Sequence, residues 1–432
     1  MAASNPELNI GAAHDLSAQA TDGTTLETLY RAAFIASCPV GLFLFFLPLY
    51  SQALGASATE IGELFAVFAL VPILARPLVG RGTDRHGRRP FILAGLALFV
   101  VAWALYAASA QVNILFVARI VEGSASALLL IPAYALLADL VPAAGRGAAI
   151  GRFQSMVNLG AFIGGGVGFP LLFAAEHFGH GIVAGWRLAF CFYTVATIIM
   201  VVMAQRRLHE PPRQLKESPP ALAVETTSRA SLRALVPLLV ICLGTSTANG
   251  VTQPILTLYL RDHFTSNLAV ILLVFTPAAL VYGIAPIPLG QLSDRIGRRR
   301  LMAIGLAAAG VVAALFPLVP HIALLGALWT IEAVCISAAV PAEGALVADI
   351  TGGAQHGTAY GLYSFAIGTG ATLGPLLGGW AYDRLDPTAP FYLNAIILPL
   401  SALLVVFLPI EARRKAPQSS EGATAGGLKG AE

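Results

Sequence analysis

The 432-residue sequence has few charged side chains. Asp, Glu, Lys and Arg make up 11% of it, whereas a soluble domain of ordinary composition carries about 25%. Hydrophobic residues account for 57%, and the mean hydropathy is +0.76. This small number of charged side chains cannot cover a water-facing surface. The composition therefore predicts a protein whose outer surface lies in lipid. The net charge of +3 is small and does not indicate nucleic-acid binding.

Cysteine is also scarce, and the motifs of soluble catalytic domains are missing. The four cysteines lie in apolar stretches without the spacing of metal ligands, so we interpret them as buried thiols and expect no metal and no cofactor. The sequence has neither a G-x-x-x-x-G-K-[ST] phosphate loop nor an H-E-x-x-H motif, which argues against an enzyme. It also lacks the charged rings or filter sequence of a channel.

Long apolar stretches are what the chain has in abundance. Each is long enough to cross a hydrocarbon core as an α-helix. They do not alternate apolar and polar side chains as the strands of a membrane barrel do. We therefore predict an all-α polytopic membrane protein with twelve transmembrane helices. The expected helices span residues 32–54, 58–79, 90–110, 112–138, 148–175, 186–205, 234–260, 267–289, 301–319, 322–348, 357–382 and 390–410.

Two polar ends and one polar interior segment divide the chain. Residues 1–28 and 412–432 have the composition of disordered tails, and residues 206–233 have that of a linker. The linker separates a helical bundle at 29–205 from a second one at 234–411. Most arginines outside the apolar stretches fall on the side of the tails and the linker. The positive-inside rule then places both termini in the cytoplasm of a multi-pass protein of the cell (inner) membrane.

The two halves share a repeated loop sequence. GRGTDRHGRR at residues 80–89 returns 210 residues later as GQLSDRIGRR at residues 290–299. A duplicated helical unit is typical of transporters whose binding site lies near the middle of the membrane, between the halves. The same offset relates four acidic residues in pairs: Glu122 with Glu332, and Asp139 with Asp349.

The repeated loop resembles the signature of the major facilitator superfamily, G-x-x-x-D-R-x-G-R-R/K, found between helices 2 and 3 and often again between helices 8 and 9. The resemblance covers roughly residues 30–412 and extends to bacterial drug and metabolite efflux proteins. It implies twelve helices in two pseudo-symmetric six-helix bundles and secondary active transport of a small organic solute by alternating access. Both signatures are complete: Gly80, Asp84, Arg85, Gly87, Arg88 and Arg89, and then Gly290, Asp294, Arg295, Gly297, Arg298 and Arg299.

The resemblance also implies a conformational latch, because the family's loop is thought to brace the outward-facing state. Arg88 lies four residues after Asp84, and Asp139 ends the fourth expected helix on the same side, so the three can form a neutralised cluster. Asp84 can also accept hydrogen bonds at the N-terminus of a helix of the other half. The alternative is that the arginines only set the topology, and the two interpretations are compatible. The second copy offers Asp294, Arg298 and Asp349.

Ionisable side chains inside the expected helices are the candidates for proton coupling. Arg119 and Glu122 are three residues apart on one helix face and can pair, and the resemblance links an arginine of the fourth helix to proton coupling. Glu332 and Glu343 have no basic partner in their own helix, so burial favours a carboxyl group that binds a proton. For all of them the alternative is a static pair or a hydrogen bond between helices.

Neutral polar groups of the first and seventh expected helices are the candidates for substrate binding, because these helices should line the cavity of this fold. We select Tyr50, Gln52, Asn249 and Gln253, although such groups can also satisfy one another in helix packing. The first helix has no acid after Glu27. Several drug/proton antiporters of the family that the loops resemble carry an acid there, so its absence favours an amphipathic or neutral solute over a cationic drug.

A glycine-rich element bears on the direction of transport. GTGATLGPLLGG at residues 368–379 resembles the G-x-x-x-G-P-x-x-G-G element that antiporters of the family carry in helix 5, but here it lies in the eleventh expected helix. Small-residue faces also occur in any tightly packed helix pair. We predict a monomer that exports a small organic solute in exchange for protons. A proton symporter or a uniporter that imports a metabolite is the alternative.

Overall fold

The computed structural model describes residues 6–142, 145–179, 181–210, 229–351 and 356–408. These residues form helices and no strand, which confirms the predicted all-α class. The first helices are α1 (Pro6–Ser37), α2 (Val40–Ala53), α3 (Ala58–His86), α4 (Arg89–Ala108), α5 (Val112–Leu140), α6 (Arg146–His177) and α7 (Gly181–Arg207). The others are α8 (Arg229–His263), α9 (Leu268–Ile284), α10 (Pro286–Ile296), α11 (Arg298–Leu315), η3 (Phe316–Leu318), α12 (Ile322–Thr351), α13 (His356–Arg384) and α14 (Ala389–Val406).

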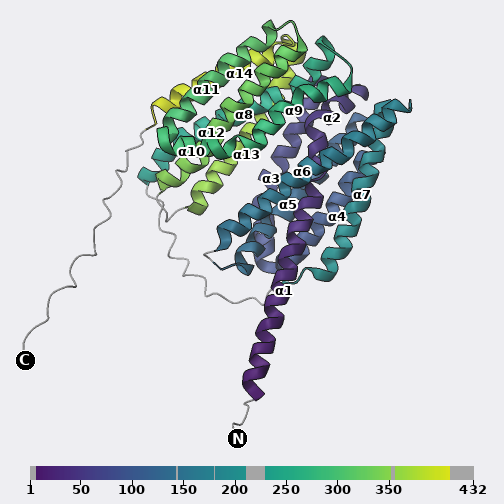
Figure 1. Cartoon of the computed structure of the whole chain (residues 1–432), viewed down its shortest axis with the longest axis vertical. Helices are drawn as coiled ribbons and strands as arrows, with labels where there is room; N and C mark the ends of the chain where they lie inside the picture. The colour runs from purple at the N-terminus through teal and green to yellow at the C-terminus, as the bar shows by residue number, and fades with distance from the viewer. Residues whose placement is uncertain (1–5, 143–144, 180, 211–228, 352–355, 409–432) are drawn as a thin grey trace, which may run out of the picture.

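The helices gather in two groups that lie side by side, α1–α7 in one and α8–α14 in the other (Figure 1). We call the end of the groups where α7 ends and α8 begins the linker end, and the opposite end the far end. Helix α1 extends beyond its group at the linker end. The groups correspond to the two halves that the repeated loop predicts.

Each expected transmembrane stretch coincides with a helix or with a bent pair of helices. Within the described ranges, nine helices are long and apolar enough to cross a membrane, and there are eleven spans if each of two bent pairs counts as one. Helix α13, at the position of the eleventh expected stretch, is not among them. The chain is thus a multi-pass membrane protein, and the total of twelve spans stays a prediction.

Proline residues account for the two bent spans. The first span, which comprises the end of α1 and α2, is bent by 56°, and α9 and α10 meet at 51°. Pro48 lies inside α2, and Pro286 begins α10. Proline lacks the backbone N–H and its ring clashes with the carbonyl group four residues earlier, so a helix bends at that point.

Glycines four residues apart allow two pairs of helices to approach closely. A Cβ atom added at Gly374 of α13 would lie 2.4 Å from the carbonyl oxygen of Thr247 in α8. One added at Gly164 of α6 would lie 2.0 Å from the carbonyl oxygen of Cys38, directly after α1. Gly164 and Gly374 are 210 residues apart, so both halves use the same contact. The glycine-rich element therefore packs α13 onto α8, which is the packing role that small-residue faces have.

The N-terminal boundary differs from the prediction. Helix α1 begins at Pro6, so residues 6–28, which the composition assigned to a disordered tail, are helical. Thr25 and Thr28 are buried. The Thr25 hydroxyl accepts a hydrogen bond from the backbone N–H of His209, and the Thr28 hydroxyl donates to the carbonyl oxygen of Thr24. Polar side chains that are hydrogen bonded in this way can be buried at low cost. Composition alone does not show which polar side chains find such partners.

The four cysteines differ in exposure. Cys38 and Cys242 are buried as predicted, whereas Cys335 is partly exposed and Cys191 is exposed on α7. The expectation of a buried thiol is therefore wrong for Cys191. An apolar side chain in a transmembrane helix can face either lipid or protein, and hydropathy does not separate the two.

Candidate functional site

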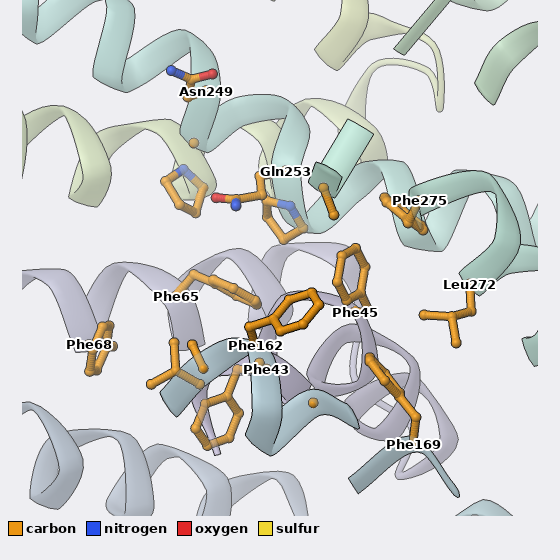
Figure 2. A pocket seen from close by; sticks show the side chains of 18 of the residues that line it. Phe43, Phe45, Phe65, Phe68, Phe162, Phe169, Asn249, Gln253, Leu272 and Phe275 are labelled. Atoms are coloured by element: carbon orange, nitrogen blue, oxygen red, sulfur yellow. The ribbon is translucent and has the colours of Figure 1, made fainter. Parts of the chain in front are cut away.

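A cavity of about 1050 Å³ lies between the two helix groups. Its walls come from α2, α3, α5 and α6 on one side and from α8, α9 and α13 on the other. Aromatic rings from both sides contribute to the walls and present flat apolar faces on which planar molecules can stack. The phenylalanines that line it, all labelled in Figure 2, are Phe43, Phe45, Phe65, Phe68, Phe162, Phe169 and Phe275.

Two predicted binding residues, Asn249 and Gln253, line this cavity. They are one turn apart on α8, which places both side chains on one helix face. Figure 2 shows them across the cavity from Phe65 and Phe162. Neither amide forms a side-chain hydrogen bond with another residue of the described part. Both are therefore available to a bound molecule.

The other two predicted binding residues lie away from the cavity. Tyr50 is buried, stacks on Trp186 with ring centroids 4.3 Å apart, and donates a hydrogen bond to the carbonyl oxygen of Ser109 at 2.7 Å. Gln52 lies at the far end of α2 and bonds residues of α8 instead. The residues of α2 that line the cavity are Val40, Gly41, Phe43 and Phe45. Tyr50 and Gln52, in the later turns of that helix, are instead directed into contacts with other helices.

The buried pair Arg119 and Glu122 forms part of the cavity wall. Arg119 Nη1 and Glu122 Oε2 are 2.9 Å apart, and both side chains are at most 2% exposed. The Tyr106 hydroxyl donates a second hydrogen bond to the same carboxylate oxygen at 2.7 Å. The structure thus brings the two residues together as their spacing predicts. Burying two charges is tolerable only when they neutralise each other and are hydrogen bonded.

Phenylalanine rings surround the guanidinium group of Arg119. Its Cζ atom lies 4.4 Å from the ring centroid of Phe43 and 5.1 Å from those of Phe65 and Phe68. A cation held over aromatic faces is attracted by their quadrupoles. Arg119, a charged residue of the cavity wall, therefore directly contacts three of the phenylalanines that line the cavity. Sequence reasoning missed this role of the phenylalanines, because in a transmembrane stretch they are simply apolar.

The two acids of α12 are buried outside the cavity. Glu343 accepts a hydrogen bond from the Thr245 hydroxyl at 2.8 Å, and Glu332 accepts one from the Asn394 amide at 3.0 Å. Among the described residues, neither forms an ion pair. Glu332 is the repeat counterpart of Glu122, but Trp329 stands where the first half has Arg119. The two equivalent acids therefore have different partners: Glu122 forms an ion pair with Arg119, and Glu332 accepts a hydrogen bond from the neutral amide of Asn394.

The signature loops form the same turn in both halves. Gly87 follows α3 with φ of +95°, and Gly297 follows α10 with φ of +99°. Residues with a side chain adopt this left-handed region only at a cost, so the turn explains why glycine occurs in both copies. By contrast, Gly80 has open space around it and Gly290 has only one distant neighbour, so nothing local in this structure explains those two glycines.

The charged residues of the two loops pair differently. Arg88 Nε lies 2.9 Å from Asp139 Oδ2, an ionic contact without hydrogen-bond geometry. Arg298 Nη2 instead binds Asp294 Oδ1 of its own loop at 3.1 Å. The side chain of Asp349, the expected partner in the second half, lies outside the described residues. The remaining latch residues Asp84, Arg85 and Arg295 are exposed, and Arg89 and Arg299 are partly exposed.

Glu210 holds the first loop and was missed because it lies in the segment assigned to the linker. Its carboxylate accepts hydrogen bonds from the backbone N–H groups of Arg88 at 2.9 Å and Arg89 at 3.5 Å. Arg89 Nη2 also donates to the carbonyl oxygen of Gln205 at 2.8 Å. An anion at the N-terminus of α4 is favoured by the helix dipole. The sequence feature that could have identified Glu210 is an acidic residue three positions after the end of α7.

The helix groups also bond to each other at the far end. Arg261 Nη1 donates to Gln52 Oε1, and Gln52 Nε2 donates to Asp262 Oδ1, each at 3.0 Å. Asp383 of α13 accepts hydrogen bonds from the first turn of α3. Next to it, a Cβ atom added at Gly62 of α3 would lie 2.1 Å from the carbonyl oxygen of Pro375. Sequence reasoning selected Gln52 for the cavity and did not identify Asp383.

Known proteins resemble this chain along most of its length. The profile of the Major Facilitator Superfamily matches residues 29–246 and 238–430. The chain is 26% identical over 398 residues to multidrug resistance protein 1 of Bacillus subtilis, an alignment that covers 91% of this chain and 98% of that protein. It is 23% identical over 425 residues to the quinolone resistance protein NorA of Staphylococcus aureus, covering 90% and 97%.

Solved structures have the same fold. A bacterial homolog of the human lysosomal transporter Spinster, in an inward-facing and unoccupied conformation, superimposes with a TM-score of 0.68 at 19% identity, covering 90% of this chain and 95% of that one. A peptide transporter, POT, gives 0.70 at 16% identity, covering 89% and 94%. At these identities the likeness concerns the fold alone, and it agrees with the resemblance of the loop sequences.

Proposed function

This chain belongs to the Major Facilitator Superfamily, and from that premise we propose that it exports a small organic solute in exchange for protons. It is a secondary active transporter of a small molecule. The observation that carries the proposal is the phenylalanine-lined cavity between the helix groups, with one buried ion pair in its wall. Relatives whose names record multidrug and quinolone resistance support export over import.

The solute we propose is a planar aromatic molecule without a strong net charge. A cavity of about 1050 Å³ is at the upper end of the range of drug-sized sites, about 300–1000 Å³. The rings offer stacking faces, and the two amides of α8 offer hydrogen bonds that orient the solute. Because Glu122 compensates Arg119, the cavity attracts neither an anion nor a cation strongly. One chain contains the whole cavity, which supports a monomer.

We assign proton coupling to the buried acids. Glu122 lies in the wall of the solute cavity, so a proton and a solute can influence each other there. A proton on Glu122 removes its charge and weakens its hold on Arg119, which changes the wall that the solute contacts. Within the described residues, Glu343 and Glu332 accept hydrogen bonds from neutral donors and form no ion pair, so proton binding relieves the cost of their burial. They are the further proton-carrying candidates.

We also assign a conformational state to the structure. With both termini in the cytoplasm of the inner membrane, the far end faces outward, and its contacts between the halves close the outer side. The structure then corresponds to the inward-facing state. The signature loops, with Asp84, Asp139 and Asp294, would close the inner side when the halves rock. Glu210 would hold the first loop ready for that closure.

Transport in inside-out vesicles tests this function. We would measure the accumulation of fluorescent planar aromatic compounds of charge zero and plus one, with the vesicle interior acid or at equal pH. Export by antiport predicts accumulation that requires the acid interior and disappears on addition of a protonophore. E122Q and E343Q should transport with a weaker pH dependence than the unmodified protein. Exchange that ignores the gradient would indicate a uniporter, and accumulation driven by an alkaline interior would indicate a symporter.

A further inference from the structure

A second, smaller groove lies at the linker end of the first helix group. It has a volume of about 240 Å³ and is formed by α1, α6 and α7. We call it the α1–α6–α7 groove. Its polar rim consists of Glu27, Tyr30, Arg31 and Arg152. No part of the transport mechanism described above uses it.

The rim carries two cations and one anion. Glu27 binds both guanidinium groups, with Oε1 3.1 Å from Arg31 Nε and Oε2 3.6 Å from Arg152 Nη2. Arg152 also lies over the ring of Tyr30, with Cζ 4.7 Å from the centroid. The two arginine side chains are 50% and 60% exposed. Since a guanidinium group has five N–H donors, most of their donors remain available, and the rim is positive overall.

The rest of the groove is apolar. Its wall below the arginines consists of aliphatic, aromatic and thioether side chains, including Met156, Ile199 and Met203. Ile199 is 56% exposed, so this wall reaches the outer surface of a transmembrane helix. A positive rim above an apolar wall, at the boundary of a membrane-spanning bundle, matches the two parts of a phospholipid: a charged head group and an acyl chain.

We propose that the α1–α6–α7 groove binds one anionic phospholipid of the leaflet at the linker end. Arg31 and Arg152 hold the phosphate group, and an acyl chain lies along Met156 and Ile199. Basic pockets between transmembrane helices are suited to anionic head groups. A zwitterionic lipid brings its own cation to the positive rim and is disfavoured. The proposal requires only that the bundle spans a membrane, so it stands apart from the proposed direction of transport.

Native mass spectrometry of the purified full-length protein tests this site. Phosphatidylglycerol and phosphatidylcholine with identical acyl chains would be titrated separately, and the fraction of protein with one retained lipid would be measured. The unmodified protein should retain phosphatidylglycerol preferentially. R31Q/R152Q should bind it about thirtyfold more weakly, about 2 kcal/mol at about 1 kcal/mol per arginine near an anionic lipid. R81Q/R300Q removes two exposed arginines elsewhere at the linker end and should retain the preference.

A third variant tests the apolar wall without a change of charge. Ala196 lines the groove, so A196F should fill it and reduce the retention of phosphatidylglycerol while both arginines remain. If R31Q/R152Q does not fold, the retention of phosphatidylglycerol by A196F tests the proposal in its place. Equal retention of the two lipids by the unmodified protein would overturn the proposal. So would retention of phosphatidylglycerol by folded R31Q/R152Q or by A196F at the level of R81Q/R300Q.

Discussion

The carboxylate of Asp383 in α13 lies 2.7 Å from the backbone nitrogen of Thr59, in the first turn of α3. It also accepts hydrogen bonds from the Thr59 hydroxyl and from the backbone N–H of Ala58. The two helices belong to different groups, so a side chain of one half caps a helix of the other. Unpaired N–H groups and the helix dipole make this position favourable for an anion. In the inward-facing state that we propose, this contact stabilises the closed far end.

The first prediction is that D383N opens the far end. An anion at a helix N-terminus contributes about 1 kcal/mol, so its loss should change the ratio of the two states by about fivefold. Spin labels placed on the far ends of α3 and α13 would report this change as a growing long-distance population in double electron–electron resonance spectra.

The control for that experiment is D386N. Asp386 lies three residues further on, and its carboxylate bonds only the Thr388 hydroxyl and backbone within the described part of the chain. The hydroxyl and the backbone N–H of Thr388 lower the pKa of Asp386. D386N removes the same charge without touching the other half, so its distance distribution should match that of the unmodified protein. Equal shifts in both variants would contradict the capping role.

The second prediction concerns the coupling between Arg119 and Glu122. Removing one member of a buried ion pair leaves an uncompensated charge and typically costs about 3–5 kcal/mol. R119A and E122A should therefore each lower the thermal unfolding temperature strongly. The double variant R119A/E122A should unfold at a higher temperature than either single variant, because no buried charge is left alone. Unfolding of the purified variants in one detergent would be followed by intrinsic fluorescence.

Additive losses in this cycle would mean that the two side chains act independently despite their contact. Tyr106→Phe provides a milder comparison, because it removes the second hydrogen bond to Glu122 and keeps both charges. It should cost about 1 kcal/mol, the usual contribution of one hydrogen bond.

The third prediction assigns solute affinity to Phe162. This side chain lines the cavity and is 71% exposed, so F162A should leave stability nearly unchanged. Loss of one stacking face should weaken binding of a planar aromatic solute by about 1 kcal/mol, about fivefold in Kd. Fluorescence titration of the solute would measure it. F178A removes an equally exposed ring just beyond the end of α6, outside the cavity, and should have no effect on Kd.

The fourth prediction follows from the close contact of α13 and α8. A Cβ atom at position 374 would lie 2.4 Å from the carbonyl oxygen of Thr247, so G374A must push the two helices apart. Forced expansion of a packed interface costs about 1–3 kcal/mol. G361A, on the same helix but with open space around its Cβ position, should be tolerated. Thermal unfolding of both variants compares them, and equal stability would exclude the packing role.

Local features of the chain predicted the fold class well. Hydropathy located the helices because lipid demands apolar side chains over a fixed length. The 210-residue repeat predicted equivalent halves, and the structure extends it to the contacts of Gly164 and Gly374. Gly87 and Gly297 form the same turn for a local reason, their positive φ. Residues 6–28 were assigned wrongly because composition does not show which polar side chains are buried, and Thr25 bonds the backbone N–H of His209, 184 residues away.

Only the tertiary structure decided which residues meet. Asp383 and Thr59 are more than 300 residues apart, and nothing in the sequence near either one indicates the other. The polar hydroxyl of Tyr50 indicated a binding residue and the apolar rings of Phe43 and Phe45 did not, yet these two rings line the cavity and Tyr50 packs on Trp186. Hydropathy reports how much apolar surface a helix has. The direction in which each side chain points is set by how the helices bend and pack, which depends on the whole bundle.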